Sequence, residues 1–125
     1  MKLFDSELKI MELLWMEEEM TAKDIAVKLH KTINWGKTTT YTVIKKCLEK
    51  GAISRQEPGF ICKAMITREE ARDYEISELV EKMFQGKADL LVAKLLDSKR
   101  IKPQELQNLK SLIETAEGGI SDDTD

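Results

Sequence analysis

Residues 34–46, Asn-Trp-Gly-Lys-Thr-Thr-Thr-Tyr-Thr-Val-Ile-Lys-Lys, gather hydroxyl and ammonium groups that can contact phosphates or the edges of nucleic-acid bases. Hydroxyls, lysine side chains and backbone N–H groups at the start of a helix all donate hydrogen bonds to phosphate oxygens. Threonine is only a moderate helix former, so helix propensity does not explain its abundance here. The first acidic residue after this stretch is Glu49. The segment therefore favours contact with a polyanion; the alternative is a threonine-rich face exposed only to solvent.

The apolar spacing around this segment predicts three helices that would position it. The first covers residues 5–15, the second begins after Thr21 as its N-cap, and the third begins near residues 36–38 and ends before Gly51. The inner face of the third helix would hold Thr40, Val43, Ile44, Cys47 and Leu48. The side chains on its opposite, outward face would be Thr38, Thr39, Tyr41, Thr42 and Lys45.

Two short strand-like runs, residues 52–57 and 60–65, follow the third helix and flank the turn pair Pro58-Gly59. Three helices and a hairpin, in this order, are typical of a winged helix-turn-helix domain, which lays its last helix in the major groove of DNA. We therefore expect residues 1–66 to form a DNA-binding domain. Its predicted contact residues are Lys37, Thr38, Thr39, Tyr41, Thr42, Lys45, Lys46 and Arg55.

Charge is distributed unevenly along the chain. The 125 residues carry a net charge of −3, but residues 28–55 contain seven lysine and arginine residues and one glutamate, a local net charge of +6. A local basic patch of this kind favours a nucleic-acid partner even in an acidic protein. The alternative is a winged-helix adaptor that binds another protein through its acidic C-terminal half and does not bind DNA specifically.

Residues 67–117 are predicted to form three helices, the first opened by a capping box at residues 67–70. The middle one, near residues 87–99, is apolar on nearly all sides and therefore has to be buried. A second copy of the chain would bury it and would place two recognition helices on a two-fold axis; packing on the chain's own N-terminal domain is the alternative. The predicted dimerisation residues are Leu79, Met83, Leu90, Leu91, Leu95, Leu109, Leu112 and Ile113. Residues 118–125 are predicted to be a disordered acidic tail.

The remaining chemistry is sparse. The sequence offers no Ser-His-Asp set and no glycine-rich phosphate loop, and it contains one histidine and two cysteines, so we expect no enzyme, cofactor or metal site. Cys47 and Cys62 are expected to be reduced, half-buried thiols, with a redox pair that displaces the wing as the alternative. No apolar run resembles a signal peptide or a membrane span, which predicts a cytoplasmic protein.

Three segments of the chain resemble the penicillinase repressors of the BlaI/MecI type, a family that includes copper-responsive relatives. They are LKIMELLW in the first helix, NWGKTTTYTVIKKCLEKGAI from the third helix into the wing, and the tail of long, short and long helices. Residues 35–53 carry the most specific part of the match, because Trp35 and Gly51 keep the family's spacing. The likeness covers nearly the whole chain except its tail.

The resemblance implies a homodimeric transcriptional repressor that binds a pseudo-palindromic operator. It also implies a membrane sensor partner with a metalloprotease domain, which cleaves the repressor in its dimerisation region. This chain has Lys94-Leu95 where the family has an Asn-Phe cleavage pair, and its tail lacks the cysteines of the copper branch. Phe60 replaces the family's basic wing-tip residue, which leaves Arg55 and Lys63 as wing candidates for phosphate contact. The resemblance thus implies the DNA-binding role without specifying the operator, the regulated genes or the inducing signal.

Overall fold

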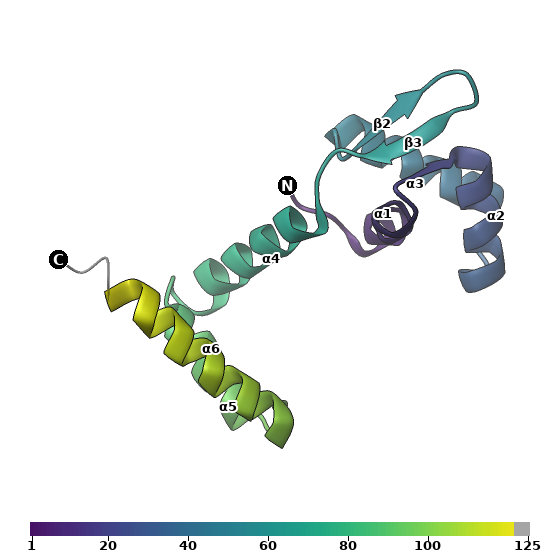
Figure 1. Ribbon diagram of the computed structural model, residues 1–125. Coiled ribbons are helices and arrows are strands. Elements are labelled where there is room, and N and C mark those ends of the chain that lie inside the picture. Colours follow the sequence, from purple (N-terminus) through teal and green to yellow (C-terminus); the bar gives the residue numbers. More distant parts are fainter. Residues whose placement is uncertain (122–125) are drawn as a thin grey trace. The chain divides into compact units, whose positions relative to one another are not determined.

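The structure, a computed structural model, describes residues 1–121 (Figure 1). The chain forms two compact units, residues 1–78 and the residues from Leu79 onward. This division lies within helix α4, Arg68–Met83, whereas the sequence suggested a boundary just before that helix. None of the helices within residues 1–121 combines the length and the apolarity needed to cross a lipid bilayer.

Three helices form the body of the first unit: α1 (Asp5–Glu17), α2 (Ala22–Ile33) and α3 (Lys37–Lys50). Each has one apolar face, and the three faces meet in a common core because burying them removes apolar surface from water. The buried core side chains include Ile10, Met11, Leu14, Ile25, Leu29, Val43, Ile44 and Cys47. The helices predicted from the sequence are confirmed.

A three-stranded antiparallel sheet completes this unit, with β1 (Glu19–Thr21), β3 (Ile61–Ala64) and β2 (Ile53–Gln56) in that order across the sheet. The predicted hairpin is present as β2 and β3, with Ser54 opposite Lys63 (Figure 1). The third strand, β1, was not predicted from the sequence. It pairs with the free edge of β3, with Met20 opposite Cys62.

Local capping fixes where the helices begin and end. Thr21 accepts a hydrogen bond from the backbone N–H of Asp24 (3.1 Å), as expected for the N-cap of α2. Gly51 takes the left-handed conformation (φ 78°) after α3, also as expected. At α1 neither Asp5 nor Ser6 caps the helix, because both lie inside its first turn; the Glu7 carboxylate accepts the N–H of Phe4 instead (2.7 Å).

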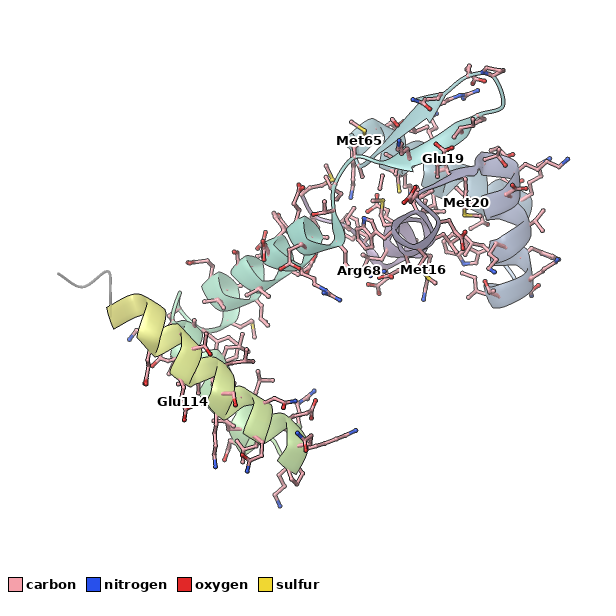
Figure 2. The ribbon with its side chains drawn as sticks, in the orientation of Figure 1. Met16, Glu19, Met20, Met65, Arg68 and Glu114 are labelled. Atoms are coloured by element: carbon pink, nitrogen blue, oxygen red, sulfur yellow. The ribbon has the colours of Figure 1, made fainter. Side chains whose placement is uncertain are left out.

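The start of α4 is attached to α1 within the first unit. The indole N–H of Trp15 donates to the carbonyl of Ile66 (2.9 Å), and Arg68, labelled in Figure 2, pairs with Glu12 (3.0 Å). The guanidinium of Arg68 also lies over the Trp15 ring, 5.5 Å from the ring centre. These contacts make the first turns of α4 part of the winged-helix unit.

The second unit contains α5 (Ala88–Asp97) and α6 (Pro103–Ser121). Gly86, at a φ of 76°, ends the turn after α4, as a glycine readily does. The prediction that the chain leaves its helix at residue 118 was wrong, because α6 continues through Gly118 and Gly119. Glycine lowers helix stability by about 1 kcal/mol but does not forbid the helical conformation. The rest of the predicted tail, residues 122–125, lies outside the described residues.

Candidate nucleic-acid interface

The outward face of α3 forms a shallow groove of about 390 Å³, and five of the predicted contact residues line it. Four of these side chains are exposed and the Tyr41 side chain is half-buried. The lining residues are Lys37, Thr38, Tyr41, Thr42 and Lys45. Thr39 and Lys46 are also exposed on α3 but do not line the groove. The structure therefore brings together on one surface most of the residues that the sequence indicated.

The first turn of α3 carries no acidic residue, and its N-cap, Gly36, provides no side-chain acceptor. The unpaired N–H groups and the positive end of the helix dipole therefore remain available to an anion. Thr40 is the one threonine of this cluster that points inward: it is fully buried, and its hydroxyl donates to the carbonyl of Gly36 (3.4 Å). Thr38, Thr39 and Thr42 remain exposed, as the helical spacing predicted.

The turn between α2 and α3 is held by Trp35, which is half-buried against the core. The backbone N–H of Trp35 donates to the carbonyl of Leu29 (3.3 Å), and the backbone carbonyl of Trp35 accepts from Nδ1 of His30 (3.1 Å). Asn34 ends α2 in the left-handed conformation, with a φ of 57°. These contacts show that Trp35 holds the turn in place between α2 and α3.

The wing contributes Arg55, an exposed side chain whose Nε lies 2.5 Å from the carboxylate of Glu57. Its guanidinium also stacks on the ring of Phe60, 3.6 Å from the ring centre. Phe60 in turn makes an edge contact with Tyr41 of α3 (6.0 Å between centroids), and the Lys37 ammonium lies 5.8 Å from the Tyr41 ring centre. A continuous row of rings and cations thus joins the wing to the start of α3.

The Glu57 carboxylate holds Arg55 and Phe60 in this arrangement through two hydrogen bonds. Besides pairing with Arg55, it accepts the N–H of Phe60 (3.2 Å). Both hydrogen bonds hold the pKa of the Glu57 carboxyl below its ordinary value, with the bond from Arg55 the larger cause. The sequence drew attention to Phe60 only as a departure from the family pattern, and no pattern in the sequence indicated that it contacts Arg55 and Tyr41.

One residue of the basic segment does not face outward. Lys50 donates to the Glu7 carboxylate (2.6 Å) and to the carbonyl of Lys2 (2.7 Å), and its ammonium lies 4.5 Å from the centre of the Phe4 ring. The Glu7 side chain is only 2% exposed. Lys50 therefore stabilises the packing of α3 on α1 and does not extend the basic surface.

The two cysteines lie in the core of this unit. Cys47 and Cys62 are free thiols and fully buried, not half-buried as the sequence suggested. Burial, together with the nearby Glu7 charge, raises the pKa of the Cys47 thiol to about 12, and burial raises the pKa of Cys62 to about 11. Both are therefore protonated near neutral pH, which suits packing better than reaction with an oxidant. Among residues 1–121, no group of three or more His, Cys, Asp and Glu side chains is placed to hold a metal ion.

Comparison with known families gives this surface its context. The family model for the penicillinase repressor matches residues 3–115 of the chain. The chain belongs to the penicillinase repressor family. This match confirms the resemblance drawn from the sequence. Known members of the family are transcriptional repressors, a class of protein that is not enzymatic.

Individual relatives are distant but match along most of their length. The penicillinase repressor of Bacillus licheniformis is 20% identical over 112 residues, covering 88% of each chain. The methicillin resistance regulatory protein MecI of Staphylococcus aureus (strain N315) is 23% identical over 110 residues, 86% of this chain and 89% of its own. The solution structure of the DNA-binding domain of the repressor BlaI matches with a TM-score of 0.51 and 25% identity, covering 54% of this chain and 84% of that domain. The mainly helical, winged helix-turn-helix fold is thereby confirmed.

Proposed function

We propose that this chain is a homodimeric transcriptional repressor that binds a pseudo-palindromic operator in duplex DNA. The observation that carries the proposal is the α3 groove, where hydroxyl, ammonium and phenol groups converge on a surface without a carboxylate. Lys45 and the threonines beside it would contact phosphates and base edges in the major groove, and Arg55 would reach the neighbouring backbone. Such a protein acts where the chromosome is, so we infer a cytoplasmic location.

The second unit supports the dimer, because the single chain leaves much of its apolar surface uncovered. No residue of α5 is fully buried, although its sequence is apolar on nearly all sides. Of the predicted dimerisation residues, Leu91 and Leu109 are half-buried. The others are exposed: Leu79, Met83, Leu90, Leu95, Leu112 and Ile113. Val92, Leu96 and Leu106 are also exposed and extend the same apolar surface. A second copy would remove this surface from water and place two α3 helices on one two-fold axis.

The signal that releases the repressor is a separate matter. The family resemblance implies a membrane sensor protease as a partner, with cleavage in the dimerisation region. The pair at that position, Lys94-Leu95, lies within helix α5 and differs from the family's Asn-Phe pair. We therefore assign the DNA-binding and dimerisation roles to this chain and leave the protease outside the proposal.

Fluorescence anisotropy with the DNA upstream of this protein's own gene tests the proposal. Wild-type protein should bind this DNA more tightly than scrambled DNA of equal length. The logarithm of its affinity should fall with the logarithm of salt concentration by about 0.9 for each phosphate neutralised. Thr39→Ala combined with Lys45→Ala should weaken binding while the dimer stays intact in sedimentation, whereas Leu91→Asp should dissociate the dimer and with it abolish specific binding.

Two results would contradict the proposal. Unchanged affinity in both variants would mean that neither α3 nor α5 has the assigned role. Equally weak binding of the wild type to native and scrambled DNA, repeated across genomic fragments, would favour the winged-helix adaptor, which recognises a protein instead of an operator.

A further inference from the structure

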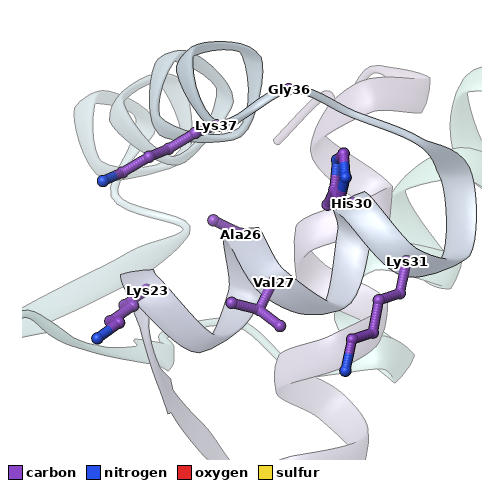
Figure 3. Close-up of a pocket in the computed structure, with 7 residues that line it drawn as sticks. All are labelled: Lys23, Ala26, Val27, His30, Lys31, Gly36 and Lys37. Carbon is purple, nitrogen blue, oxygen red and sulfur yellow. The ribbon is translucent and has the colours of Figure 1, made fainter.

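A second groove lies between α2 and the start of α3, beside the DNA-binding surface described above. It encloses about 410 Å³, which is within the range of small-molecule sites. Ala26 and Val27 form an apolar floor, and Lys23, Lys31 and Lys37 surround it, as Figure 3 shows. Lys37 also lines the α3 groove, so the two sites share one cation.

The chemistry of this α2–α3 groove is cationic and apolar at once. None of the residues that line it carries a carboxylate. Within the described part of the chain, Lys23, Lys31 and Lys37 have no ion-pair partner, and the Lys37 ammonium lies near the Tyr41 ring. Val27 leaves 47% of its surface exposed on this side of α2, opposite the core.

These features define the ligand that the groove would take. Three ammonium groups without local counter-ions favour an anion. A bare phosphate would satisfy the lysines but would leave the Ala26 and Val27 surface in water, whereas an aromatic or medium-chain body would cover that surface. The complementary ligand is therefore a small organic anion with an apolar body.

We propose that the α2–α3 groove binds such an organic anion, an aromatic or medium-chain carboxylate, and that the bound anion competes with operator DNA for Lys37. The regulatory half of this inference rests on the proposed function, whereas binding of the anion does not. It would provide a release signal that acts on the recognition helix directly, without cleavage of α5.

The first experiment measures the groove alone, in the absence of DNA. Isothermal titration and amide NMR shifts of the full chain are recorded with 1-naphthoate as the probe. 1-Naphthalenemethanol serves as the uncharged control and inorganic phosphate as the charged control without an apolar body. Naphthoate should shift the amides of residues 23–37 and bind more tightly than either control.

Matched charge reversals locate the site. Lys31→Glu should weaken naphthoate binding by about tenfold, equivalent to ~1.4 kcal/mol. Lys28→Glu makes the same change on the same helix, at an exposed position that does not line the groove, and should leave the affinity nearly unchanged. Val27→Asp places a carboxylate on the groove's floor and should weaken naphthoate binding at least as much as Lys31→Glu does. All three positions are exposed, so circular dichroism should show the wild-type fold.

The second experiment adds naphthoate to the anisotropy assay, where it should raise the apparent dissociation constant for operator DNA in the wild type and much less in Lys31→Glu. The ligand site would be overturned if inorganic phosphate bound as tightly as naphthoate. It would also be overturned if Lys28→Glu and Lys31→Glu lost equal affinity for naphthoate. Naphthoate binding without any change in operator affinity would overturn the competition for Lys37. Naphthoate binding by a protein that ignores operator DNA would instead refute the proposed function and uphold the site.

Discussion

Two lysines of α3 with opposite orientations offer a sharp test of which basic residues serve DNA binding. Lys45 is exposed and lines the α3 groove. Lys50, five residues further along the same helix, points inward and pairs with Glu7 at 2.6 Å. The perturbation is the same for both: replacement by methionine, which retains most of the apolar stem and removes the charge.

The structure predicts different losses for the two variants. Lys50→Met leaves the Glu7 carboxylate buried without its counter-ion; removing one partner of a buried pair costs ~3–5 kcal/mol. We expect about 3 kcal/mol, the lower end of that range, because the Lys50 side chain is 28% exposed and Glu7 keeps its hydrogen bond from Phe4. In a unit of this size each kcal/mol shifts the melting temperature by ~4–8 °C, so a loss of about 3 kcal/mol should lower it by about 12–24 °C. Lys45→Met, at the surface, should change stability by less than about 0.5 kcal/mol.

The DNA-binding effects should be the reverse of the stability effects. Lys45→Met should lower the slope of log affinity against log salt by about 0.9, the loss of one neutralised phosphate. Lys50→Met, measured at a temperature where the variant remains folded, should keep the wild-type slope. Thermal unfolding by circular dichroism and anisotropy at several salt concentrations give both quantities. A lowered slope with an unchanged melting temperature in Lys50→Met would refute the inward orientation of Lys50.

Phe60→Leu removes the ring that contacts Arg55 and Tyr41 but keeps an apolar side chain. It should weaken operator binding about two- to fivefold, ~0.5–1 kcal/mol, and leave the stability of the fold at the wild-type level. Unchanged affinity in the anisotropy assay would mean that the ring does not position the wing. The raised pKa values of the two buried thiols, about 12 for Cys47 and about 11 for Cys62, mean that the folded chain holds protons that the unfolded chain releases above pH ~8.5. Their contribution to stability is therefore complete below that pH and is lost as the pH rises toward the folded pKa values. Urea unfolding at pH 8, 9 and 10 should show a free energy of unfolding that falls with pH. A double variant, Cys47→Ala with Cys62→Ala, should no longer show this fall. Gly51→Ala should lower the free energy of unfolding by about 1–2 kcal/mol, because the φ of 78° is unfavourable for any residue with a Cβ. The added Cβ itself would meet no neighbouring atom within 4 Å. A melting temperature equal to that of the wild type would contradict this prediction.

The parts of the fold that the sequence predicted are those determined by local pattern. Helix α3 illustrates this, because its 3–4 spacing separated buried Thr40 from exposed Thr39 and Thr42, and Gly51 indicated where it ends. The same periodicity predicts four of the five residues of the α3 groove: Thr38, Tyr41, Thr42 and Lys45. Helical spacing suffices for such a prediction since it determines which side chains share a face.

The parts that the sequence did not predict depend on contacts between distant residues. Strand β1 is only three residues long, and its hydrogen-bonding partner, β3, lies about forty residues later in the chain. The Glu7–Lys50 pair joins residues 43 positions apart, a separation at which helical spacing does not indicate which charges meet. Phe60 contacts Tyr41 only because the wing folds back toward α3. No local pattern encodes these pairings.

The same long-range contacts change how the charge of the basic segment is counted. Its net charge of +6 assumes that every cation faces the partner, yet Lys50 is neutralised by Glu7 and Arg55 by Glu57. Five cations of this segment are exposed and have no carboxylate partner among the described residues, and all five lie on α2 and α3: Lys28, Lys31, Lys37, Lys45 and Lys46. At about 0.9 per phosphate, these five would contribute at most roughly 4.5 to the salt slope of each protomer, and the exposed Lys23 and Lys63 outside the segment would add to it. Arg55 would add to that slope only by exchanging Glu57 for a phosphate, and its ion pair with the Glu57 carboxylate opposes the exchange. Within the basic segment, the cations that keep their full charge therefore lie on α2 and α3, whereas Arg55 of the wing is held by Glu57 and Phe60.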